Sequence, residues 1–262
     1  MPRLTHVDDP SDGRLADYVD IRDRDQGSGG FLCEGMLLVE RLLDSDIEVT
    51  SLLVASSKLD RLRPRLEHRD IEVLVAPQEV LNATVGFNIH RGVIAHARRR
   101  PSLTSDDLLE RSISVAALEG ITDHENLGAV FRSALALGID GVMLDSASGD
   151  PYYRRAVRVS MGAAFTLPFA RLEASEDLIE MLNRAGYVSL ALTPDPAAAP
   201  IESLNIAEGQ RVAVLLGAEG DGLRTATMAG ATHRARIPIR AGVDSLNVGH
   251  AAAVAFHRFG SV

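Results

Sequence analysis

The chain has 262 residues, a net charge of −9 and 46% hydrophobic residues, which fits a globular protein of one large or two small domains. Cys33 is its single cysteine, which excludes an intramolecular disulfide and a cysteine-rich zinc site. Because no stretch approaches the roughly 20 apolar residues that span a bilayer and the polar N-terminus carries no export signal, we expect a cytoplasmic protein without a membrane or metal partner.

The acidic charge balance argues against a nucleic-acid partner, because sequence-independent binding to nucleic acid comes from basic surface. A net charge averages over the whole surface, however, and one local patch is enough. Lys58 is the single lysine among 27 basic residues, and the planar fork of arginine suits phosphate. Solvated helix faces are the alternative interpretation of the arginine clusters, which are Arg61, Arg63 and Arg65; Arg98, Arg99 and Arg100; and Arg154, Arg155 and Arg158.

The first part of the chain shows a polar lead-in and then a compact αβαβ pattern. Residues 1–20 are polar and rich in Asp, which predicts a loose or partly ordered segment. After this lead-in, apolar residues at helical spacing predict helices, and runs of β-branched residues predict strands. The helices are expected at Glu34–Leu43 and Leu59–His68, and the strands at Ile47–Ser56, Ile71–Val75 and Gly92–His96.

A domain boundary is predicted at Ala97–Asp107. This segment combines a basic run, Pro101 and a Ser/Thr/Asp cluster that could cap a helix at Asp106. The predicted organisation is therefore a lead-in over residues 1–20, a small α/β domain over 21–105 and a larger domain over 106–262.

Strands and helices alternate regularly after this boundary. Near-continuous apolar strands between helices predict an α/β domain with a mainly parallel sheet, and ligands of such sheets bind at the carboxyl ends of the strands. The predicted strands are Ser112–Gly120, Asp140–Asp145, Tyr187–Leu192, Arg211–Gly217 and Ala235–Ile239. The predicted helices are Asn126–Gly138, Arg154–Ala164, Ser175–Gly186 with Ser175 as its N-cap, one after Leu223, and Asn247–Arg258.

Three clusters at strand-to-helix turns are candidate sites. In the first, Asn126 and Arg132 lie on an otherwise apolar helix, where a buried arginine needs a partner; the alternative is that Arg132 reaches the surface. The second, Leu215–Leu223, places Glu219 among glycines that permit close backbone approach, without the spacing of a dinucleotide fingerprint. In the third, Ser245 and Asn247 precede a helix, where either could serve only as an N-cap.

Together the three clusters resemble the SpoU family of RNA methyltransferases. Asn126–Gly138 resembles the first family motif, Leu215–Leu223 the second and Ile237–Val248 the third, in order and at matching spacing over about residues 112–262. The connecting segment Pro151–Pro168 is also similar. The chain departs from the family pattern at His124, where proline is common, and at Gly249, where serine is common and where glycine is expected to loosen the helix start.

The front part resembles, more weakly, the substrate-binding domain that many members carry, which is similar to a ribosomal protein. This match depends on the short segments Phe31–Leu43 and Asn88–Ala95. The resemblance implies a trefoil knot in the larger domain, a homodimer with its site at the interface, and transfer of a methyl group from S-adenosylmethionine to a ribose 2'-hydroxyl of RNA. It favours 23S ribosomal RNA over transfer RNA; a non-catalytic RNA-binding paralogue and a base methyltransferase are the alternatives.

The resemblance also implies roles for individual residues. Arg132 would activate the hydroxyl, but a guanidinium does not readily lose its proton, so a phosphate clamp that stabilises the developing alkoxide is the alternative. Asn126 and Glu219 would position Arg132 or the ribose, while Ser245 and Asn247 would order the third motif and contact the nucleotide. The residues expected at the cofactor are Leu216, Gly217, Gly222, Ile237, Pro238 and Leu246.

Overall fold

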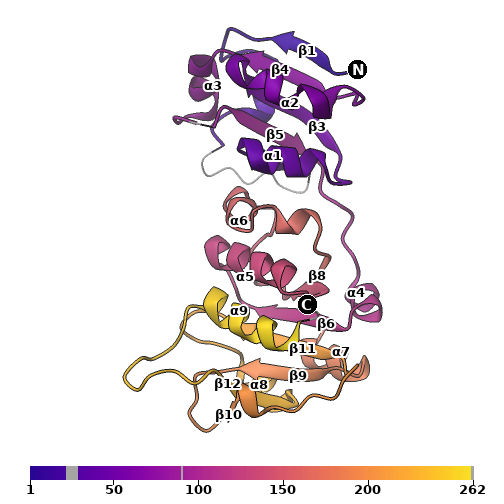
Figure 1. Ribbon diagram of the computed structural model, residues 1–262, viewed down its shortest axis with the longest axis vertical. Coiled ribbons are helices and arrows are strands. Elements are labelled where there is room, and N and C mark those ends of the chain that lie inside the picture. The colour runs from indigo at the N-terminus through magenta and orange to yellow at the C-terminus, as the bar shows by residue number, and fades with distance from the viewer. Residues whose placement is uncertain (22–28, 90, 261–262) are drawn as a thin grey trace. The chain divides into compact units, whose positions relative to one another are not determined.

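The chain forms two compact units (Figure 1). The computed structural model describes residues 1–21, 29–89 and 91–260. Unit 1 contains Met1–Arg100 together with Tyr152–Arg158, and unit 2 contains Pro101–Pro151 and the chain from Val159 onward. His90, within one segment of the front-domain resemblance, lies outside the described residues.

Unit 1 is built on a five-stranded mixed sheet in the order β1-β4-β3-β5-β2. Strands β1, β4 and β3 are parallel, whereas β5 runs antiparallel to both β3 and β2. The structure confirms both predicted helices and all three predicted strands of this region, and adds β1, β2 and α3. The elements are β1 (Arg3–His6), β2 (Phe31–Glu34), α1 (Met36–Leu43), β3 (Val49–Ala55), α2 (Leu59–Leu66), β4 (Glu72–Ala76), α3 (Gln78–Val85) and β5 (Val93–Ala97).

The lead-in over residues 1–20, which the sequence predicted to be loose or partly ordered, contains a strand and a short helix. Strand β1 pairs in parallel with β4, and a short 3-10 helix over Gly13–Tyr18 buries Leu15 and Tyr18. The Tyr18 hydroxyl also lies 2.6 Å from Ser51 Oγ on β3. A few widely spaced apolar residues anchor this segment to the sheet. The average composition of the segment did not reveal them, because the many Asp residues around them make that average polar.

Unit 2 contains a seven-stranded sheet in the order β10-β12-β9-β11-β6-β7-β8. Its neighbouring strands all pair in parallel within the described part of the chain, which confirms the predicted α/β domain with a mainly parallel sheet. Its strands are β6 (Ser114–Glu119), β7 (Gly141–Leu144), β8 (Phe169–Arg171), β9 (Val188–Leu192), β10 (Ala199–Pro200), β11 (Val212–Gly217) and β12 (His233–Arg236). Its helices are α4 (Ser105–Arg111), α5 (His124–Ala136), α7 (Leu178–Arg184), α8 (Thr225–Gly230) and α9 (Val248–Phe259), and α6 (Arg154–Val159) belongs to unit 1 as far as Arg158.

Helices cover both faces of the unit 2 sheet. Alternate strand residues such as Val115 and Leu215 pack with Leu108 of α4 and Leu182 of α7 in one apolar core. Helices α5 and α9 lie side by side, with α5 against β7 and α9 against β11 (Figure 1). Because β6, β9 and β11 are adjacent and parallel, their carboxyl ends open at one edge of the sheet, where the motif residues gather.

Several predicted element ends differ from the structure. Thr104 caps α4 through the Asp107 N–H, in place of Asp106, and Asp177 caps α7 in place of Ser175. In each case a neighbouring hydroxyl or carboxylate reaches the free helix N–H. The helix expected over residues 154–164 ends at Val159, because Met161 and Gly162 adopt φ values of 54° and 79°. Strand β12 ends at Arg236, before Ile237.

Candidate functional site

The side chains of Asn126, Glu219 and Asn247 meet in one hydrogen-bonded network. Asn126 Nδ2 donates to Glu219 Oε1 at 2.7 Å, and Asn247 Nδ2 donates to Asn126 Oδ1 at 2.7 Å and to Glu219 Oε1 at 3.3 Å. The three residues come from α5, from the loop after β11 and from the start of α9. The fold therefore joins one residue from each sequence motif, and we call these three residues the amide–carboxylate network.

Helix starts hold the two amides of this network in place. Asp123 caps α5, and its Oδ1 accepts the N–H groups of Glu125 and Asn126. Asn247 caps α9, with its Oδ1 accepting the Gly249 N–H at 2.9 Å while its Nδ2 faces the network. The N-cap role of Asn247 and its contact with the other motifs are therefore both present.

The loop after β11 requires glycine for its tight path. A Cβ added at Gly217 would lie 2.2 Å from the Gly222 carbonyl carbon and from the Leu223 nitrogen, closer than any side chain tolerates. The Gly222 N–H donates to the Ala218 oxygen at 3.0 Å, and Gly222 has a φ of 71°. The loop thus folds back on the end of its own strand.

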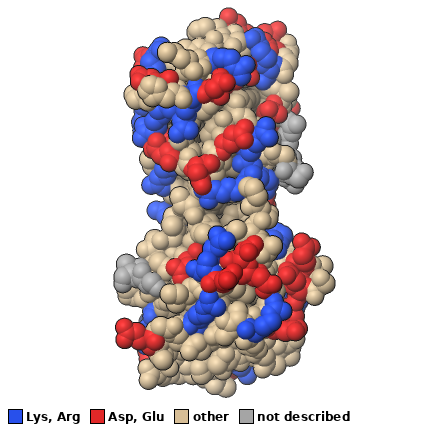
Figure 2. All heavy atoms as spheres, turned by 90° about the vertical axis from the view of Figure 1, so that its right-hand side faces the viewer, with Lys and Arg blue, Asp and Glu red and all other residues tan. Residues whose placement is uncertain are grey.

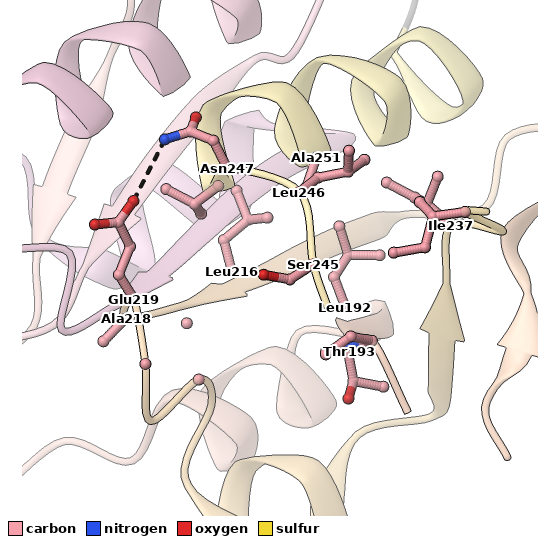
Figure 3. Close-up of a pocket in the computed structure, with 16 residues that line it drawn as sticks. Leu192, Thr193, Leu216, Ala218, Glu219, Ile237, Ser245, Leu246, Asn247 and Ala251 are labelled. Carbon is pink, nitrogen blue, oxygen red and sulfur yellow. Dashed lines mark hydrogen bonds between the residues drawn. The ribbon is translucent and has the colours of Figure 1, made fainter. Parts of the chain in front are cut away.

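A cavity of about 340 Å³ lies beside this loop (Figure 3). The labelled side chains around it come from the ends of β9 and β11, from the Ile237 region, from the segment leading into α9 and from α9 itself. Five of the six residues expected at the cofactor line it, together with Ser245, Glu219 and Asn247; Pro238 does not. The five are Leu216, Gly217, Gly222, Ile237 and Leu246.

Other lining residues were not singled out in the sequence. Thr193 and Pro194 directly follow β9, so the position of a strand's carboxyl end was the signal that could have found them. The remainder give the cavity an apolar wall and backbone edges, and carry no spacing of their own. They are Leu192, Ala218, Gly220, Ile239, Val248 and Ala251.

Arg132 stands apart from the cavity and the network. It is exposed on α5, does not line the cavity, and has no ion pair or side-chain hydrogen bond with any described residue. Six residues along a helix correspond to a rotation that leaves side chains about 120° apart, so Arg132 and Asn126 point in different directions. The exposed side chain agrees with the alternative given in the sequence analysis, that Arg132 reaches the surface.

Gly249, the departure from the family pattern on α9, is buried against α5. A Cβ at this position would lie 2.8 Å from Ala129 Cβ. The glycine therefore permits close contact between α5 and α9, the helices that carry Asn126 and Asn247.

The arginine clusters of unit 1 are largely neutralised by carboxylates. Arg61 Nε lies 2.7 Å from Glu40 Oε1, Arg65 Nε lies 3.0 Å from Asp44 Oδ1, and Arg98 pairs with Glu48 at 3.1 Å. Basic and acidic side chains are interspersed on the face drawn in Figure 2. The hydrogen bond from Arg61 lowers the pKa of Glu40, which favours the charged pair. Arginine clustering in the sequence thus overstates the local positive charge.

Membrane-spanning helices and metal clusters are absent from the described part of the chain. No helix in residues 1–21, 29–89 and 91–260 is long and apolar enough to cross a membrane. In the same residues, no group of three His, Cys, Asp or Glu side chains is arranged to hold a metal ion.

Comparison with known proteins places this site in a family. Residues 114–257 match the SpoU rRNA Methylase family. The chain is 38% identical to a Mycobacterium bovis protein named as an uncharacterized tRNA/rRNA methyltransferase, over 96% of this chain and 90% of that one. It is 30% identical to the 23S rRNA (guanosine-2'-O-)-methyltransferase RlmB of Acinetobacter baylyi, over 85% and 94%.

A solved structure has the same fold. The S-adenosylmethionine-bound rRNA methyltransferase of Sinorhizobium meliloti superposes with a TM-score of 0.82 at 24% identity, covering 97% of this chain and 96% of that one. The matched family region contains the whole amide–carboxylate network and every residue that lines the cavity. The chain belongs to the SpoU rRNA methylase family.

Proposed function

We propose that this RNA methyltransferase transfers the methyl group of S-adenosylmethionine to a ribose 2'-hydroxyl, with 23S ribosomal RNA as substrate. The observation that carries the proposal is the amide–carboxylate network, in which Asn126, Glu219 and Asn247 from three separate motifs meet beside a cavity. The proposed 2'-O specificity follows the name of the RlmB relative, which is a guanosine-2'-O-methyltransferase. Transfer RNA as substrate and RNA binding without chemistry are the alternatives that experiment must distinguish.

The cavity fits S-adenosylmethionine, which is the cofactor. Its volume of about 340 Å³ falls in the range of small-molecule sites. Apolar side chains such as Leu192, Ile237 and Leu246 suit a flat base, and the close turn at Gly217 exposes backbone groups to a ligand. Glu219 is the one charged side chain among the lining residues that the structure describes, and its negative charge suits a cation.

When bound, the cofactor supplies a methyl group made electrophilic by a sulfonium. The residues of the chain must then hold the ribose hydroxyl in line with that group, since positioning can lower a barrier by several kcal/mol. We assign this positioning to Asn126, Glu219 and Asn247, whose mutual hydrogen bonds restrict their rotamers, and assign Ser245 to the nucleotide. Glu219 Oε1 already accepts a hydrogen bond from each of the two amides. Glu219 Oε2 accepts none from a described residue, so it is the acceptor available to a substrate hydroxyl.

Arg132 is proposed to hold a phosphate and stabilise the developing alkoxide. Its exposure on α5 leaves its guanidinium accessible to RNA. Since Arg132 does not line the cavity of its own chain, we further propose a homodimer in which a second copy brings its arginine to the site. A trefoil knot in unit 2, and a role for unit 1 as an RNA-binding domain similar to a ribosomal protein, belong to the same proposal.

The proposal is tested by methyl transfer from radiolabelled S-adenosylmethionine to unmodified transcripts of 23S ribosomal RNA and of transfer RNA. We expect label in the ribosomal transcript with the wild type and loss of label with Arg132→Ala. Arg184→Ala is the matched control, because Arg184 is an exposed arginine that pairs only with Asp106 among the described residues. Full transfer by Arg132→Ala would contradict the assigned role. If the wild type bound the cofactor but transferred no label to either transcript, the result would favour an RNA-binding paralogue without chemistry. Label in transfer RNA alone would show that transfer RNA is the substrate.

A further inference from the structure

Glu119 is a buried carboxylate that the proposed chemistry does not use. It is the last residue of β6 and is 4% exposed. Burying a carboxylate is unfavourable unless hydrogen bonds or an opposite charge compensate for the lost water. The groups that satisfy Glu119 therefore indicate what the residue holds in place.

Both oxygens of Glu119 bind the start of α8. Oε1 accepts the backbone N–H of Arg224 at 2.5 Å and lies 3.1 Å from Arg224 Nε. Oε2 accepts the hydroxyl of the buried Thr227 at 2.5 Å. Arg224 is the N-cap residue of α8 and has no capping side chain of its own, so Glu119 supplies an acceptor there from another strand.

This contact closes the glycine loop beside the cavity. Glu119 is the register partner of Gly217 in the pairing of β6 with β11. The loop leaves the sheet at Gly217 and reaches Arg224 after passing through Glu219, Gly220 and Gly222, all of which line the cavity. The carboxylate of Glu119 thus ties the returning end of the loop to the strand next to its departing end.

The loop is consequently held from two sides. Glu219 is fixed by Asn126 and Asn247, and the return is fixed by Glu119. The returning part of the loop also packs closely on Gly217, where an added Cβ would lie 2.2 Å from Gly222 and Leu223 backbone atoms. Releasing the return would remove one of the two side-chain anchors that hold the cavity-lining part of the loop.

We infer that Glu119 is a positioning residue for cofactor binding, which acts through Arg224 and Thr227 on the loop over residues 217–223. The inference rests on the proposed function, because it takes the cavity as the S-adenosylmethionine site. The alternative is a purely structural role, in which Glu119 would stabilise α8 without affecting the affinity of the cavity for its ligand.

The test compares three variants of the full chain. Glu119→Gln preserves shape but cannot accept both hydrogen bonds, Thr227→Val removes only the hydroxyl that Oε2 accepts, and Glu208→Gln changes an exposed carboxylate away from the cavity. Binding of S-adenosylmethionine is measured by calorimetry. Trypsin cleavage after Arg224, whose side chain is exposed, reports release of the loop end independently of activity.

Hydrogen bonds to a charged group predict a rise in Kd of about tenfold for Glu119→Gln. Thr227→Val should raise it less, and Glu208→Gln should match the wild type. Cleavage after Arg224 should be faster in the first two variants, with KM for the cofactor raised more than kcat is lowered. If Glu119→Gln does not fold, Thr227→Val still tests the inference.

The outcomes distinguish failure of the proposed function from failure of the role of Glu119. A wild type that does not bind S-adenosylmethionine would overturn the proposed function together with this inference. A wild type that binds it, with the same Kd in the folded Thr227→Val or Glu119→Gln variants whatever their cleavage rate, would overturn the inference alone. Raised Kd and faster cleavage in both, with an unchanged control, would support it.

Discussion

The two units satisfy their polar side chains in different ways. Unit 1 pairs arginines with carboxylates near its surface, as in Arg61 with Glu40 and Arg65 with Asp44. Unit 2 also has such ion pairs, for example Arg184 with Asp106. In addition, it joins amides and a carboxylate from separate segments, as in Asn126, Glu219 and Asn247.

The difference shows where function is concentrated. Arg61 and Arg65 of the unit 1 pairs reach the surface, where water and salt screen an ion pair, so each pair contributes little to stability. The unit 2 network has directional hydrogen bonds beside a close backbone turn, and small changes in it should alter a binding site. Substitutions in the unit 2 network should therefore affect cofactor binding and activity, whereas substitutions in these ion pairs of unit 1 should affect only stability, and weakly.

The largest effect should come from Gly217→Ala. The new methyl group would meet the backbone at Gly222 and Leu223, and overpacking of this kind should displace the loop and weaken S-adenosylmethionine binding by about 10- to 100-fold. Gly13→Ala in unit 1 is the control, because a Cβ there meets nothing within 4 Å. If calorimetry gave equal Kd values for the two variants, the result would contradict the claim that the loop at Gly217 determines cofactor binding.

Two substitutions at Asn247 should separate helix capping from the network. Asn247→Asp keeps an oxygen for the Gly249 N–H but loses the donor to Asn126 and Glu219. We expect its methyl transfer to fall about tenfold or more with little change in stability. Asn247→Ala should lose activity and also about 1 kcal/mol of stability, because the cap is gone. Denaturant unfolding and methyl-transfer rates measure both; wild-type activity in Asn247→Asp would contradict the network's role.

A smaller effect is expected for Gly249→Ala. Its methyl group would lie 2.8 Å from Ala129 Cβ, and the overpacking should outweigh the gain in helix propensity, leaving a loss of about 1 kcal/mol. The second substitution Ala129→Gly should recover part of it by making room. Thermal unfolding of the single and double variants provides the measurement, and additive losses would show that the two positions do not interact.

The smallest effect concerns the charge pairs of unit 1. The pKa of Glu40 is lowered in the folded chain below its ordinary value of 4.5, mainly by the hydrogen bond from Arg61. The pair's contribution is therefore fully present above pH 4.5 and is lost as the pH falls through the folded pKa. Glu40→Gln should lower the melting temperature slightly at about pH 7 and reduce the loss on acidification. If Glu40→Gln changed the melting temperature as much as Gly249→Ala does, the result would contradict the expected difference between the two units.

The sequence predicted the architecture of unit 2 and eight of the sixteen residues at its cavity. The order of strands and helices indicated a parallel sheet, and the family motifs named Asn126, Glu219 and Asn247, which the fold brings into contact. Those motifs lie at strand ends and helix starts, where local patterns are strongest. The roles of these residues in catalysis remain predictions.

Long-range pairing was beyond the sequence pattern. Glu119 and Thr227 are 108 residues apart, and no spacing rule connects a strand end to a later helix. Likewise, the Arg61 cluster looks basic along the chain because its partner Glu40 lies on another helix, 21 residues earlier. No local pattern in the polar lead-in predicted that Tyr18 is buried in the apolar core of unit 1 and lies 2.6 Å from Ser51 Oγ of β3.

The most direct test of the central claim is alkaline hydrolysis of unmodified 23S ribosomal RNA after labelling by the wild type with radiolabelled S-adenosylmethionine. Alkali cleaves RNA through the free 2'-hydroxyl, so methylation of that oxygen blocks cleavage of the adjacent bond. We predict label in alkali-stable dinucleotides and its absence with Arg132→Ala. Label released entirely as mononucleotides would place the methyl group on a base and contradict the proposed ribose specificity.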